Sequence, residues 1–147
     1  MIIKRITVEQ LDDVLPLFSQ YMHFYGVDQP VTEYADYLME RLNNQEAFIF
    51  GAYTEADKAI GFVLNYQSFS STELGKVLVL NDLFVEPDYR NQGAANLLIR
   101  CSIELARGIQ AVRVDLCTAK VNFPAQSVYE KMGFVKDSRF FSYSLSI

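Results

Sequence analysis

The sequence predicts one domain, residues 1–147, of the α/β or α+β class, in which helices flank a mixed sheet. Two observations lead to this class. Ala47–Tyr53 and Ala59–Phe69 are apolar runs joined by a short polar segment, a pattern that predicts an antiparallel hairpin. Val77–Val85 is followed by a helical pattern and then by the apolar run Ala111–Cys117, which predicts a parallel crossover.

The N-terminal segment predicts one strand and two helices. Ile2–Ile6 is a short apolar strand, and Thr7 and Gln10 have the spacing of a capping box at a helix start. Pro16 lies within the helical pattern that follows, so either this helix starts late enough to hold Pro16 in its first turn or it kinks. Thr32 can cap the second helix. Apolar residues recur at three- and four-residue steps in both: Leu11, Val14, Leu15 and Phe18, then Tyr34, Leu38 and Leu42.

The middle of the chain predicts the hairpin, a central strand and a third helix. Gly61 marks a bulge or a close approach of another backbone within the second hairpin strand. Pro87 ends the central strand, because proline has no N–H to donate to a ladder. The third helix carries one apolar face, formed by Leu98, Cys101, Leu105 and Ile109.

The C-terminal segment predicts a short helix between strands. Asn122 can cap this helix, which ends before Gly133. Phe134–Lys136 is β-like, and in Phe141–Ile147 apolar residues alternate with serines, as in a half-buried strand. The predicted order is β-α-α-β-β-β-α-β-α-β-β, with about seven strands and about four helices. The terminal strand is a sheet edge that a homodimer could cover.

Composition narrows the class of partner. The net charge of −5 argues against nucleic acid, which usually meets a basic face, and no apolar run approaches membrane-spanning length. An acidic surface suits a cationic substrate, although solubility explains it equally well. The two cysteines form no metal-ligand or disulfide spacing, so we expect a cytoplasmic protein without a metal centre.

The junction between the central strand and the third helix has the chemistry of an anion site. The first N–H groups of a helix lack internal partners and carry partial positive charge. The small residues Gly93, Ala94 and Ala95 would let a phosphate approach them, and Arg90 would add a permanent charge. Neither the P-loop nor the three-glycine Rossmann spacing is present.

Two motifs in this order resemble those of the GCN5-related N-acetyltransferases, the GNAT superfamily. Arg90 to Ala95 reads Arg-x-x-Gly-x-Ala, which is similar to the family's pyrophosphate loop. Asn122 to Phe134 reads Asn-x-x-Ala-x-x-x-Tyr-x-Lys-x-Gly-Phe, which is similar to a second family segment. The resemblance implies a largely antiparallel GNAT-type sheet and the use of acetyl-CoA. The aromatic N-terminal helices resemble the histone/polyamine-type subgroup.

The resemblance also implies roles for individual residues. Backbone groups of Phe84 and Val85 would pair with the pantetheine arm, and the Asn122 side chain would contact the pantetheine or thioester region. Tyr129 would be the general acid that protonates the leaving thiolate. The loop that would hold the pyrophosphate comprises Arg90, Asn91, Gln92, Gly93, Ala94 and Ala95.

Each of these roles has a structural alternative. Tyr129 could be a packing residue, Asn122 could simply cap its helix, and Arg90 could be a solvated surface residue. Asp82 could bind the acceptor ammonium or act as a base through water, or it could be a strand-edge carboxylate or one paired with a lysine.

The acceptor side is less defined. In the family, the region before the second strand lines the acceptor pocket, so Tyr21, Phe24 and Tyr25 are candidate wall residues whose faces would suit a cation. The expected function is direct acetyl transfer to a primary amine, preferably a small cationic amine or polyamine. A peptide or protein amine is the rival acceptor. A binding module for acyl-CoA that lacks turnover is the alternative from another class.

Overall fold

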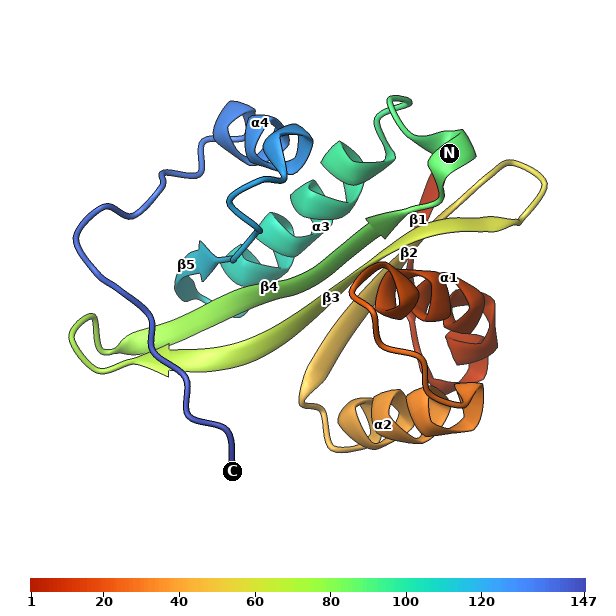
Figure 1. Ribbon diagram of the computed structural model, residues 1–147, viewed down its shortest axis with the longest axis horizontal. Coiled ribbons are helices and arrows are strands. Elements are labelled where there is room, and N and C mark those ends of the chain that lie inside the picture. Colours follow the sequence, from red (N-terminus) through yellow and green to blue (C-terminus); the bar gives the residue numbers. More distant parts are fainter. The chain divides into compact units, whose positions relative to one another are not determined.

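The computed structural model describes residues 1–147, which divide into two compact units, Met1–Cys117 and Thr118–Ile147. The first unit holds a five-stranded sheet in the order β1-β2-β3-β4-β5, together with helices α1 to α3, and the second holds helix α4 (Figure 1). The elements are β1 (Ile2–Ile6), η1 (Val8–Gln10), α1 (Leu11–Phe24), α2 (Val31–Asn43), β2 (Ala47–Tyr53), β3 (Ala59–Ser70), β4 (Gly75–Val85), η2 (Pro87–Tyr89), α3 (Ala94–Gly108), β5 (Ala111–Asp115) and α4 (Phe123–Lys131).

The sheet is mixed and mostly antiparallel, as the sequence predicts. Strands β1 to β4 pair antiparallel in chain order, and β5 pairs parallel with β4 after the crossover through α3. Both the hairpin and the crossover are therefore confirmed. The β2 and β3 hairpin strands differ from their predicted ranges only at Ser70, because the polar turn and the apolar runs mark their ends locally.

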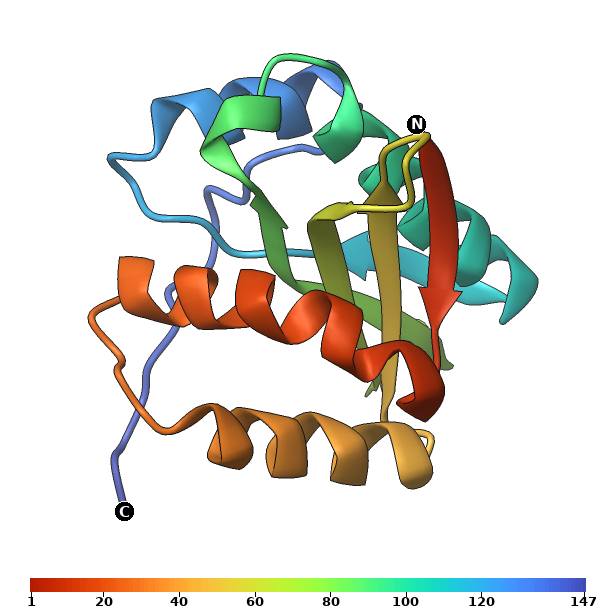
Figure 2. The same ribbon diagram turned by 90° about the vertical axis from the view of Figure 1, so that its right-hand side faces the viewer.

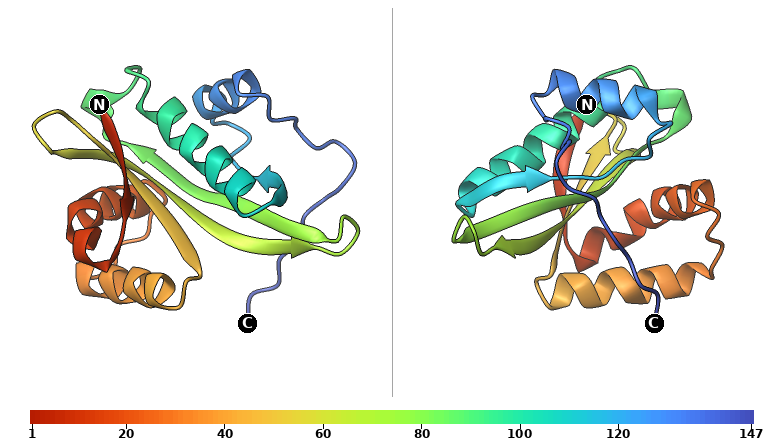
Figure 3. Two further views of the ribbon diagram at one scale, coloured as in Figure 1. Left: turned by 180° about the vertical axis from the view of Figure 1, so that it is seen from behind. Right: turned by 60° about the vertical axis from the view of Figure 1, so that its left-hand side comes forward.

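Helices cover both faces of the sheet. Figure 2 shows α1 and α2 side by side on one face, and Figure 3 shows α3 lying along β4 on the opposite face. The main apolar cluster lies between the sheet and the α1–α2 pair. It contains Phe18 and Leu38 from the helices and Phe62, Leu64 and Phe84 from β3 and β4. In this arrangement, α1 covers one face of β4.

Strand β4 pairs with β5 along only part of its length. Its parallel pairing with β5 ends at Val79, opposite Asp115, so the stretch from Leu80 to Val85 pairs only with β3. At the same point the register with β3 shifts, because Asn65 pairs with Leu80 and Leu64 pairs with Asp82. Asn81 is therefore the extra residue of a β-bulge, a device that redirects side chains along a strand.

The prediction of about seven strands is wrong, because the sheet has five. Neither Phe134–Lys136 nor Phe141–Ile147 forms a ladder with another strand. Alternation of apolar and polar residues specifies the two faces that a strand would present, whereas a strand also needs a hydrogen-bonded neighbour. The sequence places a candidate homodimer contact at this terminal segment. The segment forms no strand, and the homodimer stays a prediction.

Three local expectations have different outcomes. Helix α2 starts at Val31 with Pro30 as its N-cap, so Thr32 lies inside the first turn and does not cap it. Helix α1 starts at Leu11, which leaves Pro16 in its interior, so the late-start alternative is wrong. The close approach at Gly61 is confirmed, since a Cβ built there would lie 2.8 Å from the Phe84 carbonyl oxygen.

Candidate active site

The bulged end of β4 positions a buried carboxylate. Asp82 follows the bulge residue Asn81 and pairs with Leu64, whose side chain belongs to the apolar cluster beneath α1. The Asp82 residue is only 8% exposed, whereas Asn81 is exposed. Buried carboxylates are uncommon in proteins unless they are paired, so the neighbours of Asp82 decide what it can do.

Two neutral side chains hydrogen-bond this carboxylate. The Tyr21 hydroxyl of α1 donates to Asp82 Oδ1 at 2.6 Å, and Asn81 Nδ2 lies 3.0 Å from Oδ1 and 3.1 Å from Oδ2. Within residues 1–117, no lysine or arginine forms an ion pair with Asp82, so the lysine-paired alternative is wrong for this unit. We call Asp82, Asn81, Tyr21 and Tyr25 the Asp82 cluster.

Burial dominates the proton affinity of the cluster. It raises the pKa of Asp82 above its usual value, while the hydrogen bonds from Tyr21 and Asn81 act in the opposite direction. The pKa of Tyr21 is also raised, first by burial and then by its bond to Asp82. Tyr21 therefore stays a neutral donor at physiological pH, and no positive charge within the cluster balances an ionised Asp82.

The predicted wall residues form a row of rings that starts at this carboxylate with Tyr21 and becomes more exposed along Tyr25 and Phe24. The Tyr21 ring centroid is 5.9 Å from that of Phe62 and 5.0 Å from that of Tyr25. The Tyr25 ring in turn lies 5.1 Å from that of Phe24, which is 68% exposed. The structure thus brings Tyr21 to Asp82, packs Tyr25 against Tyr21, and places Phe24 at the solvent edge of the same row of rings.

Tyr66 on β3 is a site residue that the sequence analysis missed. Burial raises the pKa of its hydroxyl, and the charge of Asp82 contributes to the same shift. The Tyr66 hydroxyl lies 2.7 Å from that of Tyr37 on α2, and the Arg41 guanidinium lies over the Tyr37 ring. Strand alternation could have placed Tyr66 on the face of Leu64, but its approach to Asp82 depends on the bulge.

The loop between η2 and α3 has the backbone of an anion site. Gly93 is the N-cap of α3 with φ +89°, and no side chain caps the helix. Asn91 also has a positive φ, of 60°, which is uncommon outside glycine. A Cβ built on Gly93 would meet no protein atom within 4 Å, so the glycine is required by its conformation, and protein does not fill the space beside it.

Arg90 ties this loop to the end of β4. Its Nε donates to the Val85 carbonyl oxygen at 2.9 Å, and its guanidinium carbon lies 5.8 Å from the centroid of the Phe84 ring. The structure therefore brings together Phe84, Val85 and Arg90, all predicted to hold the cofactor. Ala94 is buried at the start of α3, while Asn91, Gln92 and Gly93 are exposed, and Ala95 is half-buried.

These features fit a pyrophosphate. The uncapped helix start offers backbone N–H groups, and the Arg90 side chain keeps its Nη groups as donors within residues 1–117. Helix α3 has 15 residues, enough to develop its dipole. The unpaired side of β4 from Leu80 to Val85 offers a sheet edge for an extended arm, which is the mode of β-strand addition.

The remaining predicted residues lie in the second unit, Thr118–Ile147. Asn122 caps α4 through its Oδ1, which accepts from the Ala125 N–H at 3.3 Å, so its capping role is confirmed. The Tyr129 ring packs edge-on against Phe134 at 6.0 Å, and its carbonyl accepts from the Phe134 N–H. Both residues therefore have structural contacts within this unit, which do not conflict with a further role.

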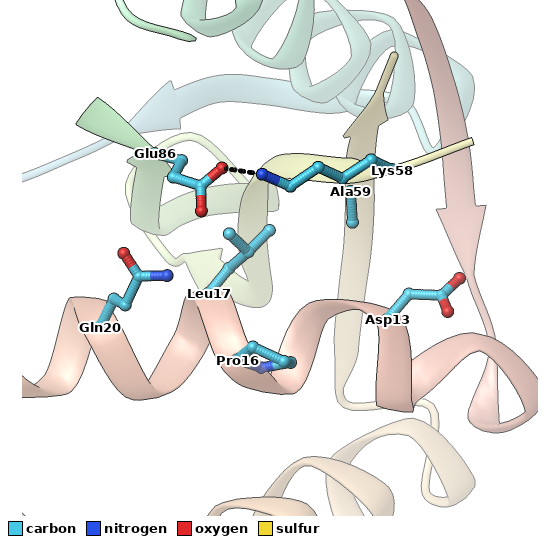
Figure 4. A pocket seen from close by; sticks show the side chains of 7 residues that line it. All are labelled: Asp13, Pro16, Leu17, Gln20, Lys58, Ala59 and Glu86. Carbon is cyan, nitrogen blue, oxygen red and sulfur yellow. Dashed lines mark hydrogen bonds and ion pairs between the residues drawn. The ribbon is translucent and has the colours of Figure 1, made fainter. Parts of the chain in front are cut away.

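A separate pocket of about 250 Å³ lies between α1 and the start of β3, as Figure 4 shows. Pro16, Leu17 and Ala59 form its apolar part. Lys58 pairs with Glu86 at 2.8 Å along its rim, where Asp13 and Gln20 also lie. None of these residues belongs to the Asp82 cluster. No group of three or more His, Cys, Asp or Glu side chains is placed to hold a metal ion, and no helix is long and apolar enough to cross a membrane.

Comparison with curated proteins links this site to a family. The family model described as "Acetyltransferase (GNAT) family" matches residues 11–134. The uncharacterized N-acetyltransferase YhfO of Bacillus subtilis is 35% identical over 134 residues, which cover 91% of this chain and 89% of that protein. The thialysine N-epsilon-acetyltransferase of Caenorhabditis elegans is 25% identical over 130 residues, or 88% of this chain and 80% of that enzyme.

Solved structures agree with the fold. A crystal structure of a probable acetyltransferase superposes with a TM-score of 0.93 at 38% identity and covers 100% of this chain and 98% of its own. The match to the family model covers more than half of the sequence and includes both motifs, the loop from Arg90 to Ala95 and the segment from Asn122 to Phe134. This chain belongs to the GNAT family of N-acetyltransferases.

Proposed function

We propose that this enzyme transfers an acetyl group from acetyl-CoA directly to a primary amine, and that the preferred acceptor is a small cationic amine or polyamine. One observation carries the acceptor assignment: Asp82 is buried beside aromatic rings with only neutral hydrogen-bond donors inside its own unit. A buried carboxylate without a counterion gains most from a ligand that brings a positive charge.

The surroundings of Asp82 suit an ammonium group. The rings of Tyr21 and Tyr25 are 5.0 Å apart, and cations are attracted to aromatic faces. The row of rings runs from buried Phe62 to exposed Phe24, so an elongated acceptor could lie along it with its reactive amine at the inner end. The relative from Caenorhabditis elegans acts, by its name, on a side-chain amine, which supports an amine acceptor.

The donor side follows from the loop and the edge of β4. Acetyl-CoA supplies the acetyl group as a thioester. The loop from Arg90 to Ala95 would hold its pyrophosphate, and the backbone groups of Phe84 and Val85 would pair with its pantetheine arm. Asn122 would contact the pantetheine or thioester region while it caps α4.

Proton transfer needs one acid and one base. Attack by a neutral amine expels a thiolate, which the Tyr129 phenol would protonate as general acid. The acceptor binds as an ammonium and must lose a proton before attack. Asp82 would hold the ammonium and accept this proton directly or through water, since its raised pKa makes it a better base than an exposed aspartate.

The acceptor class is tested by measuring CoA thiol release from acetyl-CoA with a panel of amines. The panel contains linear polyamines, amino acids, aminoglycosides and a lysine peptide, with 1,5-diaminopentane and pentylamine as a matched pair that differs in one cationic group. We expect amine-dependent release that is fastest with polyamines, and faster with the diamine than with the monoamine. A preference for the peptide would overturn the acceptor assignment. Tight acetyl-CoA binding without release for any amine would favour a binding module over a transferase.

Tyr129→Phe tests the general acid in the same assay. We expect kcat to fall by about 10²-fold, the lower end of the usual contribution of acid–base catalysis, with little change in acetyl-CoA affinity. Phe134→Leu is the matched control, because it changes the ring packed against Tyr129 and keeps the phenol. An unchanged kcat in Tyr129→Phe would remove this residue from the mechanism.

A further inference from the structure

Asp82 has a limited number of positions at which it can accept hydrogen bonds. A carboxylate offers about four lone-pair sites, two on each oxygen. Within residues 1–117, Oδ1 accepts from both Tyr21 and Asn81, and Oδ2 accepts from Asn81 alone. Donors of this unit therefore occupy both sites of Oδ1 and leave one site on Oδ2.

The two donors come from different elements, and this holds the carboxylate plane. Tyr21 reaches down from α1, and its ring is fixed by contacts with Phe18, Phe62 and Tyr25. Asn81 reaches the Asp82 carboxylate from the adjacent position of β4. The bulge allows the side chains of these two consecutive residues to meet. In a regular strand, consecutive side chains point to opposite faces.

We propose that Tyr21 and Asn81 are positioning residues: they hold Asp82 so that a single site, on Oδ2, remains for one N–H of the acceptor ammonium. This inference rests on the proposed function for its acceptor, but the positions of the donors are independent of it. The ammonium N–H that is bonded to Oδ2 is aligned for transfer of its proton to Asp82, the base of the proposed mechanism, and this transfer frees the nitrogen lone pair for attack.

The groups around Asp82 allow the effect of the Tyr21 and Asn81 hydrogen bonds to be measured by titration of Asp82. Tyr21 faces it from α1, with Tyr25 packed against Tyr21, and Tyr66 faces it from β3, while Tyr37 and Arg41 of α2 lie behind Tyr66. Burial raises the pKa of Tyr21 and of Tyr66, so neither of these hydroxyls carries a charge near pH 7 that would mask the charge of Asp82. Because the bonds from Tyr21 and Asn81 lower the pKa of Asp82 against the effect of burial, removing either donor should raise it.

The test compares Tyr21→Phe and Asn81→Ala with Tyr53→Phe as the matched control. Tyr53 donates to Asp13 at 2.9 Å, so its replacement also breaks a bond from a tyrosine to an aspartate of the α1 segment, but away from Asp82. For each variant, the pKa of Asp82 is measured by carbon NMR of the carboxyl group. The KM and kcat for the preferred amine, and the pH profile of kcat/KM, are measured in parallel.

We expect the pKa of Asp82 and the acid limb of kcat/KM to move to higher pH in Tyr21→Phe and in Asn81→Ala. The amine KM should rise about tenfold, the effect of losing roughly one hydrogen bond to a charged group, with a smaller change in kcat. The titration of the free amine is common to all variants, so differences in the limb belong to the enzyme. Tyr53→Phe should leave both measurements unchanged.

Each other result overturns one specific claim. An unchanged Asp82 titration in both folded variants would overturn the positioning role, and so would an equal effect of Tyr53→Phe. Asn81 is exposed, so Asn81→Ala decides the question where Tyr21→Phe does not fold. The expected titration shifts without turnover of any amine by the wild-type enzyme would keep the positioning role and instead contradict the proposed function.

Discussion

The buried Asp82 carboxyl lowers the stability of the folded protein when it is ionised. Its residue is 8% exposed, its neighbours in the same unit are neutral donors, and burial is the largest influence on its raised pKa. Hydrogen bonds from Tyr21 and Asn81 offset part of this cost. A group selected only for stability would be apolar at this position, so its charge points to function.

Asp82→Asn should therefore raise the melting temperature at neutral pH. Between the usual aspartate pKa of 3.8 and the raised pKa of folded Asp82, the folded state binds more protons, so the wild type loses stability as pH rises through this window. The asparagine variant does not titrate. The melting-temperature difference, variant minus wild type, should be near zero below the window, grow through it and stay constant above it.

Calorimetric scans at several pH values measure this difference. Asp13→Asn is the control, because Asp13 is an exposed carboxylate that accepts a tyrosine hydroxyl, and its replacement should not raise the melting temperature. A melting-temperature difference for Asp82→Asn that shrinks as pH rises would show that the folded protein favours the charged form of Asp82.

At the scale of elements, the end of β4 depends on how closely β3 approaches it. Gly61 pairs with Val85, and a Cβ at Gly61 would lie 2.8 Å from the Phe84 carbonyl oxygen and 3.2 Å from a Val85 methyl group. The backbone of residues 84 and 85 also anchors Arg90 through the Val85 carbonyl. The position of the loop that precedes α3 therefore follows from the packing of β3 against β4.

Gly61→Ala should separate these strands and destabilise the protein by about 1–3 kcal/mol, the usual cost of overpacking. Acetyl-CoA affinity should fall as well, because Phe84 and Val85 are predicted to contact it. Gly108→Ala in α3 is the control: a Cβ there meets no atom within 4 Å, so alanine should stabilise the helix by up to about 1 kcal/mol. Urea denaturation measures both, and equal stabilities of Gly61→Ala and wild type would contradict the close approach.

At the scale of the whole molecule, most elements could be predicted because their signals are local. The predicted ranges of β1 and β2 agree with the structure, and that of β3 differs from it only at Ser70. Periodicity, caps and turn residues act over a few positions, so one sequence suffices to find them. Phe141–Ile147 shows the limit: it has a strand's alternation but forms no strand.

The candidate site divides in the same way. The loop from Arg90 to Ala95 could be found from sequence, because a strand end, small residues and a helix start adjoin along the chain. The Asp82 cluster could be found only in part. Its carboxylate stood out as a polar residue in an apolar strand, but the contact with Tyr21, 61 positions away in sequence, and the approach of Tyr66 required the fold.

By itself, the sequence determined the family motifs and the order of the first eight regular elements, since each depends on neighbouring residues. It also predicted an anion-binding role for the loop before α3. Only the tertiary structure decided that β4 has a bulge at Asn81, that β4 and β5 part after Val79, and that Asp82 is buried under Tyr21 without a cation in its unit. Strand register and burial arise from contacts between distant segments, and a local sequence pattern does not specify these contacts.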